Sequence, residues 1–129
     1  MQYLFLAGRI LYGGFFLLAG IDHFRYVSMM APYAGSKGIP APRLSVLGSG
    51  ALLVLGGLSF LLGVRPTWGA LFVTLFLVPV SLLMHNYWAV TDPTGRLQEM
   101  TNFKKNVGLL GAAWMSLLIT GPWPLSLNW

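Results

Sequence analysis

The sequence predicts an all-α integral membrane protein, an up-and-down bundle of four transmembrane helices. Of its 129 residues, 56% are hydrophobic and 9% are charged, and the mean hydropathy is +0.70. Soluble domains devote about a quarter of their residues to charge, so this chain has too little polar surface to cover a water-soluble globule. Four apolar stretches, each close to the ~20 residues that cross a bilayer, use most of the length. We therefore expect a single membrane domain over residues 1–129, without β-sheet.

The first two helices are expected at about 3–24 and 43–64. The first stretch is interrupted only by Arg9 and, near its end, by Asp22 and His23. It has no charge before Arg9 and no good cleavage site after its apolar run, so we expect a retained span and not a cleaved signal peptide.

The last two helices are expected at about 67–90 and 99–121. Arg65-Pro66 predicts a tight turn before the third helix, because proline favours the first helical turn. Asp92-Pro93-Thr94-Gly95 is a strong turn signal between the third and fourth helices. Gly121-Pro122-Trp123-Pro124 ends the fourth, since two prolines cannot continue a helix.

The long loop between the first two helices, residues 25–42, is expected to contain one short helix lying along the membrane interface. Its aromatic residues and methionines predict this helix: Phe24, Tyr26, Met29, Met30 and Tyr33. Gly35 and Gly38 supply turns that other residues resist. We expect the segment to close over the helix ends as a lid, with Lys37 pointing inward.

The polar residues of the predicted spans gather at the loop-side end. In an up-and-down topology the end of the first helix, the end of the third and the start of the fourth share one membrane level, and Lys37 can approach from the loop. Ionisable groups near a bilayer are costly and usually face protein or a water-filled cavity. The candidate ligand-binding residues form what we call the loop-side cluster: Asp22, His23, Lys37, His85, Asn86, Trp88, Asn102, Lys105 and Asn106.

Each of these residues also has a structural interpretation. The two histidines fit hydrogen-bonded structural residues, a ligand or proton-relay site, or metal ligation. They show no metal-ligand spacing, so no metal site is predicted. Asn102 and Asn106 suit helix capping and interhelical hydrogen bonds, and Lys105 suits a headgroup contact. Arg9, about two turns inside the first helix, either snorkels to the interface or donates hydrogen bonds to a carbonyl-bearing ligand.

The charge balance points to lipid as a partner. Eight Lys and Arg against three Asp and Glu give +5, and at this hydropathy anionic headgroups are the expected counterpart, with no nucleic acid. The positive-inside rule places the long loops in the cytoplasm and both termini outside. The loop side carries six basic residues: Arg25, Lys37, Arg43, Arg96, Lys104 and Lys105.

The sequence contains no cysteine, which excludes disulfides, thiolate catalysis and cysteine-ligated zinc in this chain. It also shows no evident flavin, haem or metal motif. No catalytic residue is predicted, and whether the chain is an enzyme stays open at this point.

Five segments of the chain together form a recognisable pattern. They are 9–24, which ends in Gly20-Ile21-Asp22-His23-Phe24, the loop 33–42, the glycine-rich 55–63, His85-Asn86-Tyr87-Trp88, and 102–111, which begins Asn102-Phe103-Lys104-Lys105-Asn106. In these segments the chain resembles the DoxX family of small four-helix membrane proteins. Each matching segment alone is a weak signal, but together the segments cover nearly the whole chain in the family's order.

The resemblance implies a four-helix membrane bundle associated with redox chemistry in a bacterial or archaeal plasma membrane. Relatives include a quinone-reducing subunit of thiosulfate oxidation, proteins linked to quinone resistance and partners of secreted superoxide dismutase, with the Surf-type cargo receptors more distant. Many members carry a glutamate three residues before the Gly56-Gly57 pair, where this sequence has Leu53. A mechanism that uses this acid is therefore not available here.

Two functions are compatible with the resemblance. The first is a subunit that binds a quinone or similar lipophilic ligand within a redox-associated membrane complex. His85, Asn106 and Lys105 would then serve as donors, with Asp22 and His23 as a relay to water. The electrons would come from a partner redox protein, which makes the chain an oxidoreductase subunit. The alternative is a non-enzymatic scaffold, chaperone or cargo adaptor that docks a partner through the first loop. Either form can assemble as a homo-oligomer.

Overall fold

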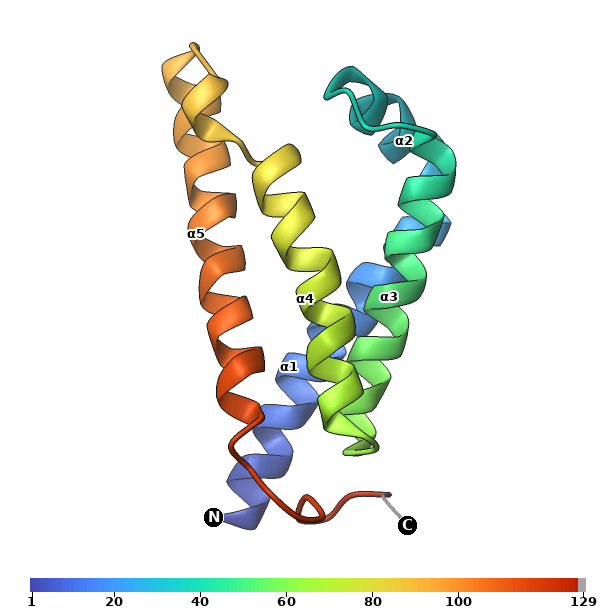
Figure 1. Cartoon of the computed structure of the whole chain (residues 1–129), viewed down its shortest axis with the longest axis vertical. Helices are drawn as coiled ribbons and strands as arrows, with labels where there is room; N and C mark the ends of the chain where they lie inside the picture. The colour runs from blue at the N-terminus through green and yellow to red at the C-terminus, as the bar shows by residue number, and fades with distance from the viewer. Residues whose placement is uncertain (128–129) are drawn as a thin grey trace.

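The structure, a computed structural model, describes residues 1–127 and is all-α over that part of the chain, as the sequence predicts. Four long helices alternate in direction, so the N-terminus and the segment after the last helix lie at the same end (Figure 1). We call this the terminal end and the opposite one the loop end. The helices are α1 (Gln2–Arg25), α2 (Val27–Ser36), α3 (Pro42–Leu62), α4 (Pro66–Leu83) and α5 (Pro93–Ser116), with a 3-10 helix at Tyr87–Ala89.

Within the described residues, three segments are long and apolar enough to cross a membrane. They are Gln2–Arg25, Pro42–Leu62 and Pro66–Ala89, with mean hydropathies of 1.8, 2.0 and 2.0. The helix α5 is as long as α1 but is not among them, because its first half carries charged and amide side chains. The predicted fourth span therefore stays a prediction.

The helices α1 and α3 cross with their backbones in contact. A Cβ atom added at Gly13 would lie 2.6 Å from the Leu61 nitrogen, and one at Gly57 would lie 2.5 Å from the Leu17 nitrogen. Small residues allow membrane helices to approach this closely. Other helix glycines have open space at the Cβ position: Gly14, Gly48, Gly108 and Gly111.

The long helices pack in a row, α1 on α3, α3 on α4 and α4 on α5. Among the described residues, α1 and α5 meet through side chains and not through close backbones. The Tyr12 hydroxyl donates to the Leu109 carbonyl at 2.5 Å, and the Lys105 ammonium lies 5.9 Å from the centre of the Phe15 ring. The buried core between the helices consists of Phe16, Leu53, Phe60, Ala70, Val73, Leu77, Ala113 and Trp123.

The start of α5 corrects the sequence prediction. The predicted turn at 92–95 is instead the first turn of this helix, which begins at Pro93 and not near 99. The Asp92 carboxylate accepts a hydrogen bond from the Gly95 amide at 2.8 Å, and proline occupies the first helical position. These are the features of a helix N-terminus. At its other end α5 stops at Ser116, before the predicted end at 121.

The end of α4 also differs from the prediction, since the helix stops at Leu83 and not near 90. The His85 amide bonds the Val80 carbonyl at 3.2 Å, five residues back, which widens the last turn. Asn86 then adopts φ −78° and ψ 69°, outside the helical region. The short helix expected in the first loop is present as α2.

Arg9 caps the terminal end of α3. Its side chain is 4% exposed, and each of its three nitrogens donates to a backbone carbonyl: Nε to Phe60 at 3.2 Å, Nη2 to Leu61 at 2.9 Å and Nη1 to Pro124 at 2.6 Å. Carbonyls in the last turn of a helix have no partner within it, and a cation there also matches the helix dipole. Arg9 therefore neither snorkels to the interface nor lies with the loop-side cluster.

Candidate ligand-binding site

A cavity of about 640 Å³ lies at the loop end, lined by residues of α2, α3 and α4 and by His23 of α1. In Figure 1 this is the end at which α4 diverges from α2 and α3. Much of the lining is apolar and includes Met30, Ile39, Val46, Leu52, Phe76 and Leu83. The polar side chains among the lining residues are His23, Tyr33, Ser45, Ser49 and His85. Such a volume is typical of small-molecule sites, which measure roughly 300–1,000 Å³.

His23 is held in the last turns of α1 by its own helix. Its Nδ1 atom lies 2.7 Å from the Ala19 carbonyl oxygen. A carbonyl only accepts, so Nδ1 carries the proton and Nε2 is the free ring nitrogen. The ring also packs edge-on against Phe76 of α4, with centroids 5.7 Å apart. His23 therefore offers a fixed imidazole to the cavity.

His85 follows the end of α4 and pairs with Glu99 of α5. Its Nδ1 atom lies 2.6 Å from Glu99 Oε2, and both side chains are mostly buried. The Tyr33 hydroxyl of α2 donates to the other carboxylate oxygen at 3.4 Å. One carboxylate therefore connects the lid helix, the turn after α4 and the start of α5.

Glu99 is the site residue that the sequence prediction missed. It lies on α5 three residues before Asn102 and seven before Asn106, so these side chains share one helix face. That spacing is the signal that identifies it.

The phenol of Tyr33 is kept in its neutral form. Burial raises the pKa of Tyr33, the negative charge of Glu99 raises it further, and the hydrogen bond to that carboxylate acts in the same direction. An ordinary tyrosine already has a pKa of about 10. Tyr33 therefore remains a hydrogen-bond donor throughout the physiological pH range.

Lys37 points inward, as the lid hypothesis requires, but its partner is not Asp22. The half-buried side chain donates from Nζ to Asn86 Oδ1 at 3.5 Å, and Nζ lies 6.0 Å from the centre of the Tyr33 ring. The lid helix α2 is thus joined to the far side of the cavity through Lys37–Asn86 and Tyr33–Glu99. Both hydrogen bonds are long, so they close the site weakly.

The Lys37 contact leads to a prediction about the lid. Lys37→Ala is expected to raise hydrogen exchange in the amides of α2 about fivefold, because the lost hydrogen bond is worth about 1 kcal/mol. Arg96→Ala removes the same charge from an exposed position on α5 and is expected to leave α2 unchanged. Equal acceleration in the two variants would mean that net charge, and not this contact, controls the lid.

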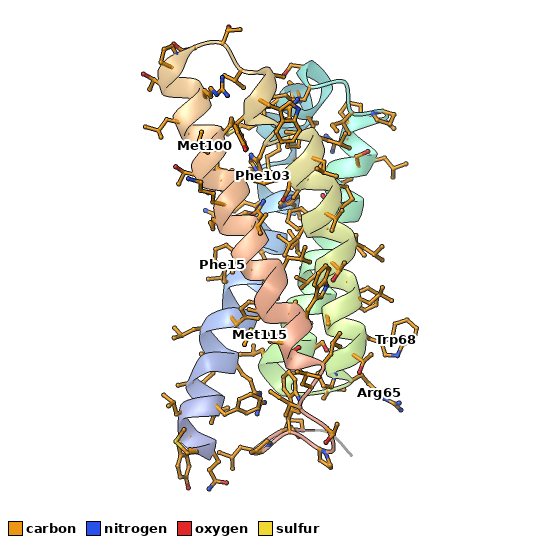
Figure 2. The ribbon with its side chains drawn as sticks, turned by 60° about the vertical axis from the view of Figure 1, so that its left-hand side comes forward. Phe15, Arg65, Trp68, Met100, Phe103 and Met115 are labelled. Atoms are coloured by element: carbon orange, nitrogen blue, oxygen red, sulfur yellow. The ribbon has the colours of Figure 1, made fainter. Side chains whose placement is uncertain are left out.

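The remaining members of the loop-side cluster lie outside the cavity lining. Asp22 is exposed and has no ion-pair partner among the described residues. Lys105 is exposed and faces Phe15 of α1. Trp88 packs edge-on against Tyr87 and against Phe103, which lies on the loop-end half of α5 (Figure 2).

The two asparagines of α5 differ in burial. Asn102 is half-buried, whereas Asn106 is 6% exposed and lies one turn before Leu109 and Leu110, which pack against the core. Neither carboxamide has a hydrogen-bond partner among the described residues. Of the loop-side cluster, His23 and His85 line the cavity. Lys37 and Asn86 pair with each other outside its lining, and the α5 members do not line it either.

The apolar spans and this fold define a helical integral membrane protein. The model of the DoxX family matches residues 4–86, which include nearly all of α1, the whole of α2, α3 and α4, and His85. The match covers well over half of the chain, and the protein belongs to the DoxX family. Searches of curated proteins and of solved structures found no match.

Proposed function

We propose that this DoxX-family protein is an integral membrane subunit that binds a quinone, or a similar lipophilic ring, in the loop-end cavity. One observation carries the proposal: an apolar cavity of about 640 Å³ whose lining includes two imidazoles and a phenol. Ligand sites combine an apolar lining with a few placed polar groups. A quinone is a flat apolar ring with two carbonyl oxygens that accept hydrogen bonds, so the lining residues fit it.

The polar groups of the cavity suit hydrogen bonding and proton transfer. His23 and His85 both direct Nδ1 to a protein acceptor, which leaves Nε2 to serve the cavity. A neutral imidazole accepts a proton at Nε2, and an imidazolium donates from it. The Glu99 carboxylate lies 2.6 Å from His85 Nδ1 and so holds the ring in place. Tyr33 adds a neutral hydroxyl donor.

The redox role requires a partner. A bound quinone supplies an acceptor for two electrons and two protons and leaves as the hydroquinone. We assign the electrons to a partner redox protein and the proton handling to the two imidazoles of this chain. The protein therefore acts as the quinone-binding subunit of a redox-associated complex in the cell membrane.

We also propose that α5 is the fourth span of a single membrane domain. Its 24 residues extend about 36 Å, enough for a hydrocarbon core of about 30 Å. It runs beside α4 in the opposite direction, with its polar half at the loop end. The exposed basic residues are also concentrated at the loop end, which favours a cytoplasmic location for the long loops.

Filling the cavity tests the proposed function. Gly48 lines the cavity, and a Cβ atom there meets no other atom within 4 Å, so Gly48→Phe places a ring in the ligand space without a backbone clash. We expect this variant to bind a short-chain benzoquinone at least tenfold more weakly, a change of about 1.4 kcal/mol. The measurement is equilibrium binding to the purified full chain in detergent.

The matched control is Gly108→Phe, the same substitution at an exposed α5 glycine that also has open space. It is expected to bind the benzoquinone as the wild type does. Equal affinity in all three proteins would show that the ring does not bind in this cavity. Absence of measurable binding to the wild type would reject the quinone assignment. It would favour the alternative function, a non-enzymatic scaffold, chaperone or cargo adaptor.

A further inference from the structure

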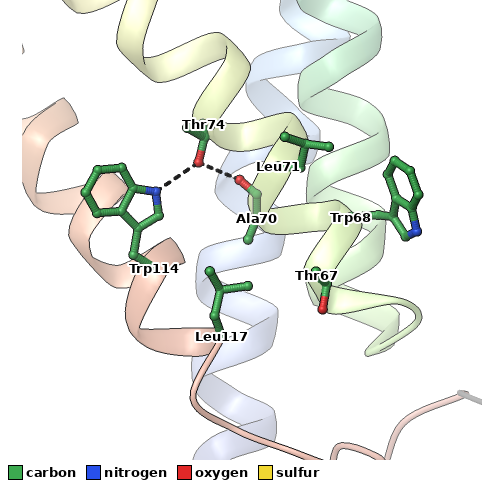
Figure 3. A pocket seen from close by; sticks show the side chains of 7 residues that line it. All are labelled: Thr67, Trp68, Ala70, Leu71, Thr74, Trp114 and Leu117. Atoms are coloured by element: carbon green, nitrogen blue, oxygen red, sulfur yellow. Dashed lines mark hydrogen bonds between the residues drawn. The ribbon is translucent and has the colours of Figure 1, made fainter.

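A second hollow of about 460 Å³ lies in the terminal half of the molecule, between α4 and α5, and shares no lining residue with the loop-end cavity. Figure 3 shows its lining side chains, which come from the first turns of α4 and the last turns of α5. They include Thr67, Trp68, Leu71, Thr74, Trp114 and Leu117. We call it the α4/α5 groove.

The groove offers apolar walls, because its central polar groups are already paired. The Trp114 indole donates from Nε1 to Thr74 Oγ1 at 3.1 Å, and the Thr74 hydroxyl donates to the Ala70 carbonyl at 2.7 Å (Figure 3). This chain of hydrogen bonds also fixes the indole against α4. An occupant of this part of the groove therefore gains from apolar contact and not from hydrogen bonds.

Along the span, the groove lies at the depth of the part of an acyl chain that is nearest to the lipid headgroup. Its α4 residues lie within about 12 Å of the start of that helix at Pro66. Trp68 and Trp114 are both about half exposed, on helix surfaces that would face the bilayer. Tryptophan rings favour the region between the headgroups and the acyl chains.

A cation lies at the terminal end of α4, two residues before the groove residue Thr67. The Arg65 guanidinium is exposed and has no hydrogen bond or ion pair with the described residues. Figure 2 shows Arg65 and Trp68 projecting from the same end of the molecule. The other basic side chain at this end, Arg9, already binds three carbonyls.

The backbone at Arg65 is one that glycine would adopt more easily. Its φ of 49° lies in the left-handed region, which is unfavourable for residues with a Cβ atom. The Ser59 hydroxyl holds this turn by its contacts with the carbonyls of Val64 at 2.7 Å and Arg65 at 3.0 Å. The chain thus has a charged arginine at a position where the left-handed backbone would favour glycine.

We propose that the α4/α5 groove binds one acyl chain of an anionic phospholipid, with the headgroup phosphate paired to Arg65. An apolar groove that ends beside an unpaired cation is complementary to this amphiphile. The phospholipid comes from the bilayer around the protein. The groove shares no lining residue with the loop-end cavity, so the two proposals can fail separately.

Arg65→Gly tests the charge without straining the fold. Glycine relieves the left-handed backbone, so the thermal stability of the lipid-free protein is expected to be unchanged or higher. In native mass spectrometry, retention of phosphatidylglycerol is expected to fall about fivefold, while retention of phosphatidylcholine stays the same. Arg96→Ala removes equal charge at the loop end and is expected to retain both lipids as the wild type does.

Leu71→Trp tests the groove by filling it, and it is expected to lower retention of both lipids. Unchanged phosphatidylglycerol retention in Arg65→Gly would overturn the proposal, as would equal losses in Arg65→Gly and Arg96→Ala. A wild-type dimer that Leu71→Trp converts to a monomer would also overturn it, because a second copy of the chain would then occupy the groove.

Discussion

Replacing Gly13 with valine is expected to force α1 away from α3 and to leave little folded protein. A Cβ atom at Gly13 would lie 2.6 Å from the Leu61 nitrogen and 2.7 Å from the Gly57 carbonyl oxygen. Both neighbours are backbone atoms, which cannot rotate aside as a side chain can. We expect a loss of about 3 kcal/mol or more, because over-packing already costs about 1–3 kcal/mol where neighbours can still shift. Thermal melting of the purified protein in detergent measures the effect.

Gly14→Val is the matched control for this prediction. Gly14 is the next residue of the same helix, and its Cβ position has no atom within 4 Å. Both variants exchange glycine for the same β-branched residue in the same helix, so the difference in melting isolates the contact with α3. Equal melting temperatures would show that the close crossing of α1 and α3 contributes nothing to stability.

Arg9→Leu is the second change with a large expected effect. It leaves the carbonyls of Phe60, Leu61 and Pro124 without their donor. A buried acceptor that loses its partner costs about 1–3 kcal/mol, so we expect a total loss of about 3 kcal/mol or more. The segment after α5 should also loosen, since Pro124 is held by this contact. Hydrogen exchange at the Leu127 amide, which bonds the Leu62 carbonyl at 2.9 Å, reports that loosening.

Arg9→Lys separates the charge from the geometry. Lysine keeps a cation near the negative end of the α3 dipole, but its single ammonium cannot reproduce the planar fork that meets three carbonyls. An intermediate melting temperature is expected. If Arg9→Leu melts as the wild type does, the cap on α3 is dispensable and this account of the terminal end fails.

The helix bounds were predictable where a change in hydropathy marks them. They were less predictable where individual capping or turn residues decide them. Apolar side chains mark α1 and α3 along nearly their whole lengths, so their bounds fall close to the predicted ones. Asp92 followed by Pro93 is compatible with both a turn and a helix N-terminus, and the structure selects the helix. Beyond Leu83 the aromatic residues continue the apolar pattern although the chain has left the helix.

The sequence was enough to predict at which end of the bundle the candidate site residues lie. It was not enough to predict which of them point into the cavity. Topology brings the ends of α1 and α4 to one level, which is why His23 and His85 line one cavity as expected. Consecutive residues on a helix point about 100° apart, so the neighbouring Asp22 faces away from it. The same rotation exposes Lys105 while it buries Asn106. Hydropathy alone does not show which face of a helix end points into the cavity.

The contact between Arg9 and Pro124 also constrains the order in which the protein can be made. Its two ends are 115 residues apart, and the α3 acceptors follow Arg9 by 51 and 52 residues. At a synthesis rate of about 5–20 residues per second, Pro124 emerges roughly 6–23 s after Arg9. During that interval Arg9 can reach only the two α3 carbonyls, and its third donor must be met by water or lipid headgroups. The first helix of the chain therefore cannot complete its contacts until nearly the whole chain has been made.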